Sequence, residues 1–133
     1  MDLRTETRDA YRLEIPADAR FLTTARLFAA AIARQSCDED VVDDVKLGVT
    51  EAVSALLGAI GGDGPVFISA HPEPGELHFA VGRAGAAVGM QPGPDPSGPV
   101  TGLALARRVL PSLAVDGGGA ETTIWFSVRS TGL

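Results

Sequence analysis

The sequence predicts an α+β domain in which helices cover one face of a mostly antiparallel sheet. Two observations predict this class. Apolar residues recur at helical spacing over 18–35 and 36–60, and they alternate with polar residues in several short segments. The predicted elements also follow the order β-α-α-β-β-loop-α-β-β. At 133 residues, the chain suits one domain with a core large enough to fold alone.

The chain is expected to begin with a strand followed by a helix. Tyr11, Leu13 and Ile15 alternate with polar residues, which predicts a short strand that Pro16 ends. Asp18 is a typical helix-capping residue, and it precedes apolar side chains that recur at helical spacing. We therefore expect a helix that Asp18 caps and that runs to about residue 35.

A second and longer helix is predicted next. The segment Ser36-Cys37-Asp38-Glu39 fits the capping-box pattern, and the acids at 38–40 would lie at the positive end of the helix dipole. The apolar stripe of this helix consists of Val41, Val45, Val49, Ala52 and Leu56. Three glycines within 61–64 mark its end near residue 60.

A hairpin and a long loop are predicted after the second helix. Strands at 66–70 and 77–81 flank a turn at 71–75 that is rich in proline and glycine. His71 and His78 lie beside this turn, and because no third ligand is evident we interpret them as surface histidines. The stretch 83–99 is rich in Gly, Pro and Ala, and loops of that length are usually functional lids or disordered.

The remaining elements are a helix and two strands. The helix is predicted at 101–110, where Pro111 ends it, and the strands at 113–115 and 122–128. A run of glycines at 117–119 forms the turn between these strands. Trp125, in the last strand, is expected in the core. We expect residues 1–10 to form a flexible N-terminal segment, 11–129 a single domain and 130–133 a tail.

Composition excludes several classes of function. Hydrophobic residues make up 45% of the chain and charged residues 21%, which is typical of a globular protein. The net charge of −6 and the pI of about 4.7 oppose direct binding of DNA or RNA, which requires clustered Lys and Arg. No apolar run approaches the roughly 20 residues that span a bilayer, and the polar start lacks a signal-peptide core. A cytoplasmic protein is therefore expected. Cys37 is the only cysteine, which excludes an intramolecular disulfide.

Three stretches of the first half resemble a known family. They are residues 13–18 (Leu-Glu-Ile-Pro-Ala-Asp), the pair Ala25-Arg26 and residues 43–52 (Asp-Asp-Val-Lys-Leu-Gly-Val-Thr-Glu-Ala). These stretches resemble the opening of the bacterial anti-sigma regulatory factors and serine-protein kinases, which are histidine-kinase-like ATPases of the Bergerat fold. The resemblance implies a two-layer α/β sandwich, a homodimer and a protein partner in transcription regulation.

The family's first nucleotide motif places a Glu and an Asn four residues apart, so that both lie on one helix face. The resemblance implies that Glu51 matches the Glu, which acts as a general base. Ala55 stands where the Asn should hold Mg²⁺, and alanine has no metal-ligating atom. Ser54 is rotated by about 100° from that position, so we predict no metal ligands. The alternative for Glu51 is a polar residue that lines a pocket no longer used.

The later nucleotide motifs are only partly present. Arg83 stands where the family has an Asp that accepts a hydrogen bond from adenine, and Arg can only donate. The resemblance assigns the remaining positions of a degenerate ATP pocket to Gly85, Gly102, Leu103 and Thr122. Gly102-Leu103 is what is left of a glycine-rich turn that cradles phosphates at a helix start.

Two kinds of arginine have open interpretations. Arg83 can bind an anion, block the pocket by pairing with Glu51 or Asp95, or be solvated. Arg20 and Arg26 on the first helix are candidates for contacting a protein partner, because an arginine fork pairs well with carboxylates. Their alternative is a solvated helix face.

The sequence leaves three functions to compare. The first is an anti-sigma-factor-like regulator that binds a sigma factor or an anti-sigma antagonist, with weak or no ATP binding. The second is an active serine/threonine protein kinase that uses Mg-ATP to phosphorylate an antagonist, with Glu51 as the base. The third is a dimeric scaffold module without a regulatory target.

Overall fold

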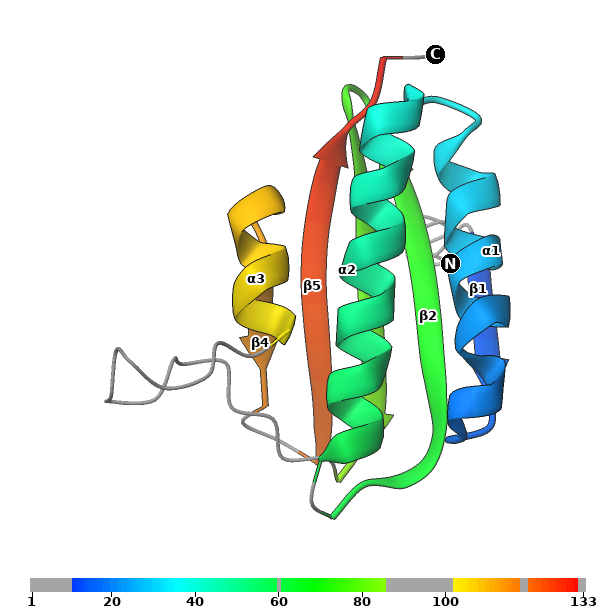
Figure 1. Cartoon of the computed structure of the whole chain (residues 1–133), viewed down its shortest axis with the longest axis vertical. Coiled ribbons are helices and arrows are strands. Elements are labelled where there is room, and N and C mark those ends of the chain that lie inside the picture. The colour runs from blue at the N-terminus through cyan, green and yellow to red at the C-terminus, as the bar shows by residue number, and fades with distance from the viewer. Residues whose placement is uncertain (1–10, 60, 86–101, 118–119, 132–133) are drawn as a thin grey trace, which may run out of the picture.

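A computed structural model describes residues 11–59, 61–85, 102–117 and 120–131. It contains a five-stranded antiparallel sheet with the strand order β1-β2-β3-β5-β4. The α1 and α2 helices lie side by side on one face of the sheet, and α3 lies beside them over β4 (Figure 1). The elements are β1 (Tyr11–Ile15), a 3₁₀ turn (Ala19–Phe21), α1 (Leu22–Ala33), α2 (Glu39–Gly58), β2 (Asp63–Glu73), β3 (Glu76–Ala84), α3 (Gly102–Val109), β4 (Ala114–Asp116) and β5 (Glu121–Arg129). The predicted α+β class with helices on one face is confirmed.

Aspartates cap the first helical elements. The Asp18 side chain accepts a hydrogen bond from the Arg20 amide at 2.9 Å and so caps the 3₁₀ turn that leads into α1. The cap of α2 is Asp38, whose side chain accepts from the Val41 amide at 3.0 Å. The predicted capping box at Ser36 is therefore wrong by two residues. Asp38 and Ser36 are both suitable caps, and the Ser36 amide instead continues the turn that ends α1.

The β2–β3 hairpin is longer than its sequence predicts. Its turn contains only Pro74 and Gly75, and Gly75 adopts a φ of +80°. His71 therefore belongs to β2 and pairs directly with His78 of β3. The predicted turn at 71–75 is wrong because strand pairing extends over Pro72. β3 also includes Arg83, where the long loop is predicted to begin. Residues 86–99 of that predicted loop lie outside the described residues.

The core lies between the sheet and the helices. Ile68, Phe79 and Phe126 project from three neighbouring strands and are at most 2% exposed, and the two phenylalanine rings stack at 5.2 Å. Gly48 lets α2 approach the sheet, because a Cβ there would lie 2.6 Å from a Leu110 methyl carbon and 2.9 Å from the Phe126 ring. This close approach fixes the position of α2, the helix that carries Glu51.

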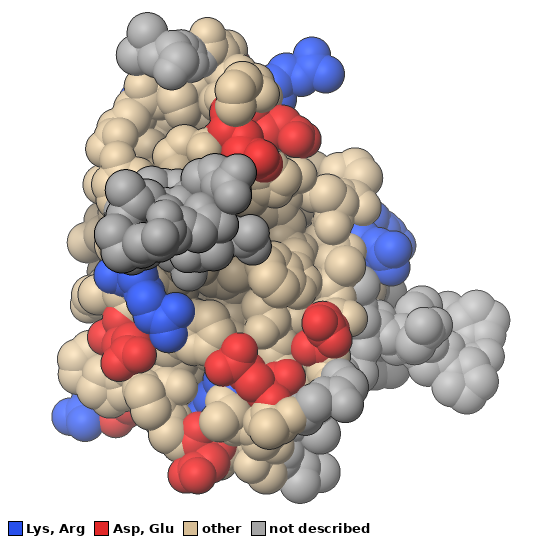
Figure 2. Space-filling model, turned by 180° about the vertical axis from the view of Figure 1, so that it is seen from behind, with Lys and Arg blue, Asp and Glu red and all other residues tan. Residues whose placement is uncertain are grey.

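The other face of the sheet carries no helix among the described elements. Figure 2 looks onto this face, where acidic side chains stand at the upper end and again toward the lower end, with uncharged surface between them. Trp125 lies here and is 48% exposed, so its predicted place in the core is wrong. Its neighbours Ile124 and Phe126 are buried toward the helices, and alternation along β5 turns Trp125 the opposite way. None of the described helices is both long and apolar enough to cross a membrane.

Candidate functional site

Glu51 lies on α2 with its carboxylate against the start of α3. The side chain is half-buried, and a Cβ on Gly102 would overlap Glu51 Oε1 and lie 2.7 Å from Cδ. Gly102 is the first residue of α3, where backbone N–H groups lack helical partners and the helix dipole favours negative charge. The structure therefore brings two of the predicted site residues together, and any larger residue at position 102 would displace the Glu51 carboxylate.

The position predicted for a metal ligand is apolar. Ala55, one turn beyond Glu51, is half-buried and packs against the hydrophobic core, whereas Ser54 is exposed to solvent. Within the described ranges, no group of three His, Cys, Asp or Glu residues is arranged to hold a metal ion. Among the described side chains around Glu51, the position where the fold family holds Mg²⁺ with ATP therefore offers no metal ligand.

Arg83 is bound to the main chain at the C-terminal end of α2. Its Nε donates to the Gly64 carbonyl at 3.1 Å, and its Nη1 donates to the Leu56 carbonyl at 3.3 Å. Leu56 lies in the last turn of α2, where a positive charge stabilises the helix dipole. The guanidinium also packs against Gly62, where a Cβ would overlap Nη1 and lie 2.7 Å from Cζ. Arg83 thus fastens β3 to the end of α2.

This anchoring bears on two of the interpretations that the sequence left open for Arg83, pairing with Glu51 and a solvated side chain. Arg83 forms no ion pair with Glu51, since both are described and neither appears in any described salt bridge with the other. Asp95 lies outside the described residues. Two of the five N–H donors of Arg83 are used by main-chain carbonyls, so the side chain is not simply solvated.

Gly85 and Gly61 let two backbone segments meet beside Arg83. Gly85 has a φ of +69° and Gly61 a φ of +82°, and a Cβ on Gly85 would lie 2.7 Å from the Gly61 carbonyl oxygen. The Gly85 amide donates to the Ala120 carbonyl at 2.7 Å. Gly85 is therefore required by the backbone itself, whatever it contributes to a ligand.

The remaining predicted site residues lie in two places. Leu103 is 3% exposed and belongs to the core, and Thr122 is 2% exposed on β5, directly across from Arg83. Neither presents a free surface to a ligand. Arg20 binds Asp18 through Nε at 3.0 Å and Nη2 at 2.8 Å, and this side-chain contact lowers the pKa of Asp18. Arg26 donates to the Thr23 hydroxyl at 3.4 Å. Arg20 lies in the 3₁₀ turn and Arg26 in α1, whereas the other predicted site residues lie on other elements.

Two glycines of the site were not predicted as functional residues. From the sequence, Gly61 and Gly62 are predicted only to end a helix. Their contacts with Gly85 and the Arg83 guanidinium depend on chain segments more than 20 positions away. The one available signal was the pair of adjacent glycines, because a single glycine suffices to end a helix.

Comparison with known proteins identifies the family. Residues 15–128 match the family model described as the histidine kinase-like ATPase domain. The chain also resembles two nucleotide-free crystal forms of the catalytic domain of the histidine kinase ThkA. The first has a TM-score of 0.53 and 13% identity, covering 91% of this chain and 99% of that one. The second has a TM-score of 0.51 and 12% identity, covering 92% and 99%.

No curated protein sequence matches the chain. The structural likeness, at these identities, concerns the fold alone, whereas the family model covers most of the sequence. The element order, the helix that carries Glu51 and the match over residues 15–128 agree with one another. The chain therefore belongs to the histidine kinase-like ATPase domain family.

Proposed function

We propose that this domain is an anti-sigma-factor-like regulatory protein of bacterial transcription that binds a sigma factor or an anti-sigma antagonist, with weak or no ATP binding. The fold of an ATPase domain is retained, whereas the residues that would hold Mg²⁺ and read adenine are replaced. A domain of this kind acts through its surface, and its acidic net charge of −6 suits a partner with a basic surface.

The observation that carries this proposal is the anchoring of Arg83. At the position where the family has an adenine-reading carboxylate, this chain has a guanidinium held by the Leu56 and Gly64 carbonyls. A carboxylate accepts a hydrogen bond from the adenine amino group, whereas a guanidinium cannot, because both groups are donors. Ala55 removes the metal ligand in addition, so two separate parts of nucleotide recognition are missing.

Titration calorimetry with Mg-ATP tests the nucleotide part of the proposal. We expect no heat of binding at micromolar concentrations of protein and no rise in melting temperature with millimolar Mg-ATP. The double variant Ala55→Asn/Arg83→Asp is measured alongside the unaltered chain, because it restores both residues of the family's nucleotide motifs. Tight Mg-ATP binding by the unaltered chain contradicts the proposal.

The partner part is tested separately. The sigma factors and antagonist proteins of the same organism are purified, and each is titrated into the full chain in the absence of nucleotide. We expect one of them to bind, and charge reversal at Arg20 and Arg26 tests whether the predicted arginines contribute. Failure of every sigma factor and antagonist to bind overturns this part even if ATP binding is absent.

A serine/threonine protein kinase is the second candidate, and the position of Glu51 favours it. Its carboxylate is half-buried beside the start of α3, where family members bind phosphates. A kinase would transfer the γ-phosphoryl group of ATP to an antagonist protein. Incubation with labelled ATP and the antagonist tests this candidate, and Glu51→Gln should abolish any transfer. Equal labelling with Glu51→Gln would exclude Glu51 as the base.

A further inference from the structure

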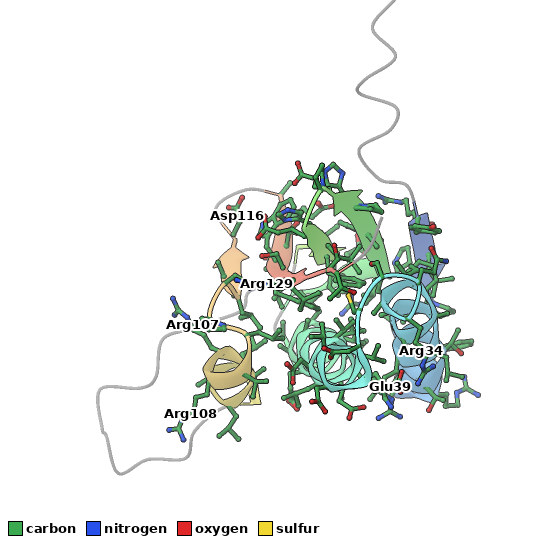
Figure 3. The ribbon with its side chains drawn as sticks, turned by 90° about the horizontal axis from the view of Figure 1, so that it is seen from above. Arg34, Glu39, Arg107, Arg108, Asp116 and Arg129 are labelled. Carbon is green, nitrogen blue, oxygen red and sulfur yellow. The ribbon has the colours of Figure 1, made fainter. Side chains whose placement is uncertain are left out.

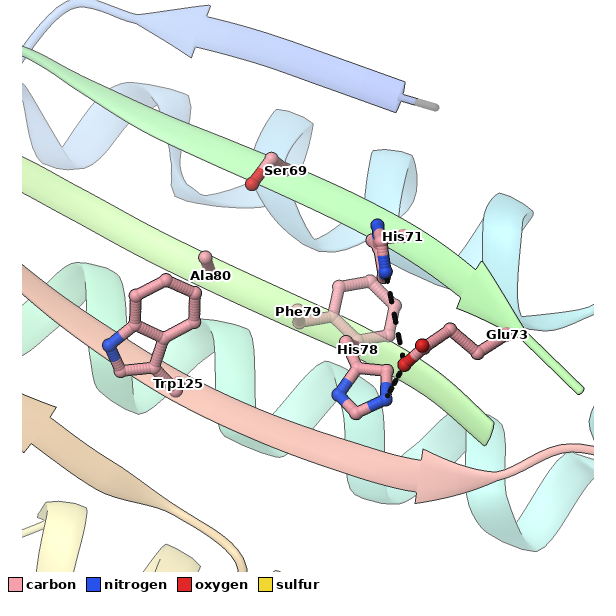
Figure 4. A pocket seen from close by; sticks show the side chains of 7 residues that line it. All are labelled: Ser69, His71, Glu73, His78, Phe79, Ala80 and Trp125. Carbon is pink, nitrogen blue, oxygen red and sulfur yellow. Dashed lines mark ion pairs between the residues drawn. The ribbon is translucent and has the colours of Figure 1, made fainter. Parts of the chain in front are cut away.

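The face of the sheet opposite the helices carries a pocket that the nucleotide site does not use. It has a volume of about 340 Å³ and lies across β2, β3 and β5 (Figure 4). That volume is at the lower end of the range in which proteins bind small ligands or single side chains. The floor is formed by two small residues, Ser69 and Ala80, which are neighbours in the β2–β3 register.

One end of the pocket gathers two imidazoles around a carboxylate. The Nε2 of His78 lies 2.7 Å from Oε2 of Glu73, and the Nε2 of His71 lies 3.8 Å from the same oxygen. The two imidazole rings meet edge to face at 5.8 Å. Although His78 Nε2 is close to the carboxylate, it is out of line for a hydrogen bond and is shielded from solvent. This buried nitrogen therefore lacks the aligned partner that buried polar atoms usually have.

The carboxylate of Glu73 retains capacity for another donor. Its side chain is 49% exposed, and among the described residues only the two imidazoles lie within ion-pair distance of it. Glu76 is the next carboxylate on this face, 3.5 Å from His78 Nε2, and its neighbour across the β3–β5 register is Arg129. Glu73 therefore differs from Glu76, because no arginine faces it in the sheet.

The other end of the pocket is aromatic. Trp125 is 48% exposed, and its neighbours across both strand pairs are alanines, Ala80 on β3 and Ala114 on β4. Its indole therefore stands above small side chains and offers a face to a ligand. Figure 4 shows Trp125 and Glu73 at opposite ends of the pocket. Tryptophan faces attract cations and the alkyl chains next to them.

We propose that this pocket binds an alkylammonium group, with the ammonium at the Glu73 carboxylate and the alkyl chain passing over Ala80 toward Trp125. An ammonium carries three donors and no acceptor, which suits a carboxylate whose side chain is 49% exposed. The same chemistry is supplied by a free amine or by a lysine side chain of another protein. The pocket and Glu51 lie on opposite faces of the sheet, so this inference stands independently of the proposed regulatory function.

The chain offers a direct readout, since Trp125 is its only tryptophan. The full chain is titrated with pentylamine and with Nα-acetyl-lysine amide while Trp125 emission is recorded. Pentanol and Nα,Nε-diacetyl-lysine amide are the neutral controls. We expect a saturable change in emission with the amines and none with the controls. Tighter binding of pentylamine identifies a free amine as the ligand, whereas tighter binding of the lysine amide identifies a protein side chain.

Two variants separate the pocket from general charge effects. Glu73→Gln removes the proposed ammonium partner, and Glu14→Gln removes a carboxylate of the same sheet face that pairs with Arg12 at 3.5 Å. We expect Glu73→Gln to raise the dissociation constant about tenfold, the usual effect of losing a charge-assisted hydrogen bond, and Glu14→Gln to leave it unchanged. Melting temperatures confirm that both variants fold. Equal responses to pentanol and pentylamine, or unaltered binding by Glu73→Gln, overturn the proposal.

Discussion

The carboxylate of Glu51 lies against Gly102, where it occupies the space that a Cβ on the first residue of α3 would take. The contact joins the family's catalytic position to the remnant of its phosphate-binding turn. In this chain, both positions are therefore constrained by packing, which gives them effects on stability that can be measured without any ligand.

The first prediction concerns Gly102→Ala. The new methyl group must displace either the Glu51 carboxylate or α3, and we expect the free energy of unfolding to fall by about 1 kcal/mol in urea titrations. Gly58→Ala is the matched control. A Cβ at Gly58, the last residue of α2, meets nothing within 4 Å, so this change should stabilise by about 0.5–1 kcal/mol.

A double-mutant cycle identifies the cause of that loss. In the Glu51→Ala background the carboxylate is gone, and Gly102→Ala should cost clearly less than it does in the unaltered chain. An equal cost in both backgrounds would show that the two residues do not interact.

The second prediction concerns Arg83→Met, which keeps the alkyl stem and removes the donors. The Leu56 and Gly64 carbonyls then lose their partner, and we expect a destabilisation of about 1–3 kcal/mol. Arg107→Met is the control, because Arg107 on α3 is exposed at the outer side of the molecule (Figure 3). Its effect should remain within about 0.5 kcal/mol.

Gly62→Ala extends the Arg83 experiment. The added methyl group would overlap the guanidinium, so this substitution should destabilise the unaltered chain and have a smaller effect when residue 83 is Met. Comparable melting temperatures for Arg83→Met and Arg107→Met would refute the anchoring role of Arg83.

The third prediction concerns the pH dependence of stability. Burial raises the pKa of Asp44 above its ordinary value of 3.8, and the charges of Asp40, Asp43 and Asp38 raise it further. The protonated carboxyl is thus favoured in the folded state. Its contribution to stability is present below pH 3.8 and is lost as the pH rises through the raised pKa.

Asp44→Asn removes the loss of stability that ionisation of the Asp44 carboxyl causes. At pH 7 the variant should therefore melt at a higher temperature than the unaltered chain. The difference should shrink as the pH falls below 4. Asp116→Asn is a suitable comparison, because Asp116 is exposed at the far edge of the sheet. A lower melting temperature for Asp44→Asn at pH 7 would contradict the pKa direction.

The fourth prediction concerns the reactivity of Cys37. Burial raises the pKa of this thiol, and the nearby charge of Asp38 raises it further, although the Ser36 hydroxyl partly offsets both effects. Because the thiolate is the reactive form, alkylation by iodoacetamide at neutral pH should be slow and should accelerate as the pH rises. The same chain in urea, where burial is lost, should react faster. Faster alkylation of the folded chain than of the chain in urea would show that the folded structure does not raise the pKa of the Cys37 thiol.

Much of the fold could be predicted because its elements leave periodic patterns. The stripe along α2 and the alternation in β1 depend only on local spacing, and both elements lie near their predicted places. Trp125 is expected in the core from its place in an alternating strand, but Ile124 and Phe126 are the residues of β5 that face the core. The hairpin ends were missed because pairing with a neighbouring strand extended β2 through Pro72.

The site was only partly predictable, for a different physical reason. The spacing of Glu51 and Ala55 is local, so the missing metal ligand was evident in the sequence. The partners of Arg83 are main-chain carbonyls, which any residue type supplies, and they lie 19 and 27 positions earlier in the chain. No pattern of side chains identifies such partners. The roles of the predicted ligand and partner residues stay predictions until binding is measured.

The strand order has a consequence for how the chain reaches its native state. β5 is the last strand, yet it lies between β3 and β4. The β2–β3 hairpin can form early, whereas β4 has no described partner other than β5 and must wait for it. The Thr131 amide then donates to the Ser36 carbonyl at 2.7 Å, across 95 positions. Such distant pairings slow folding, so we expect the docking of the C-terminal strand to limit the folding rate of this protein.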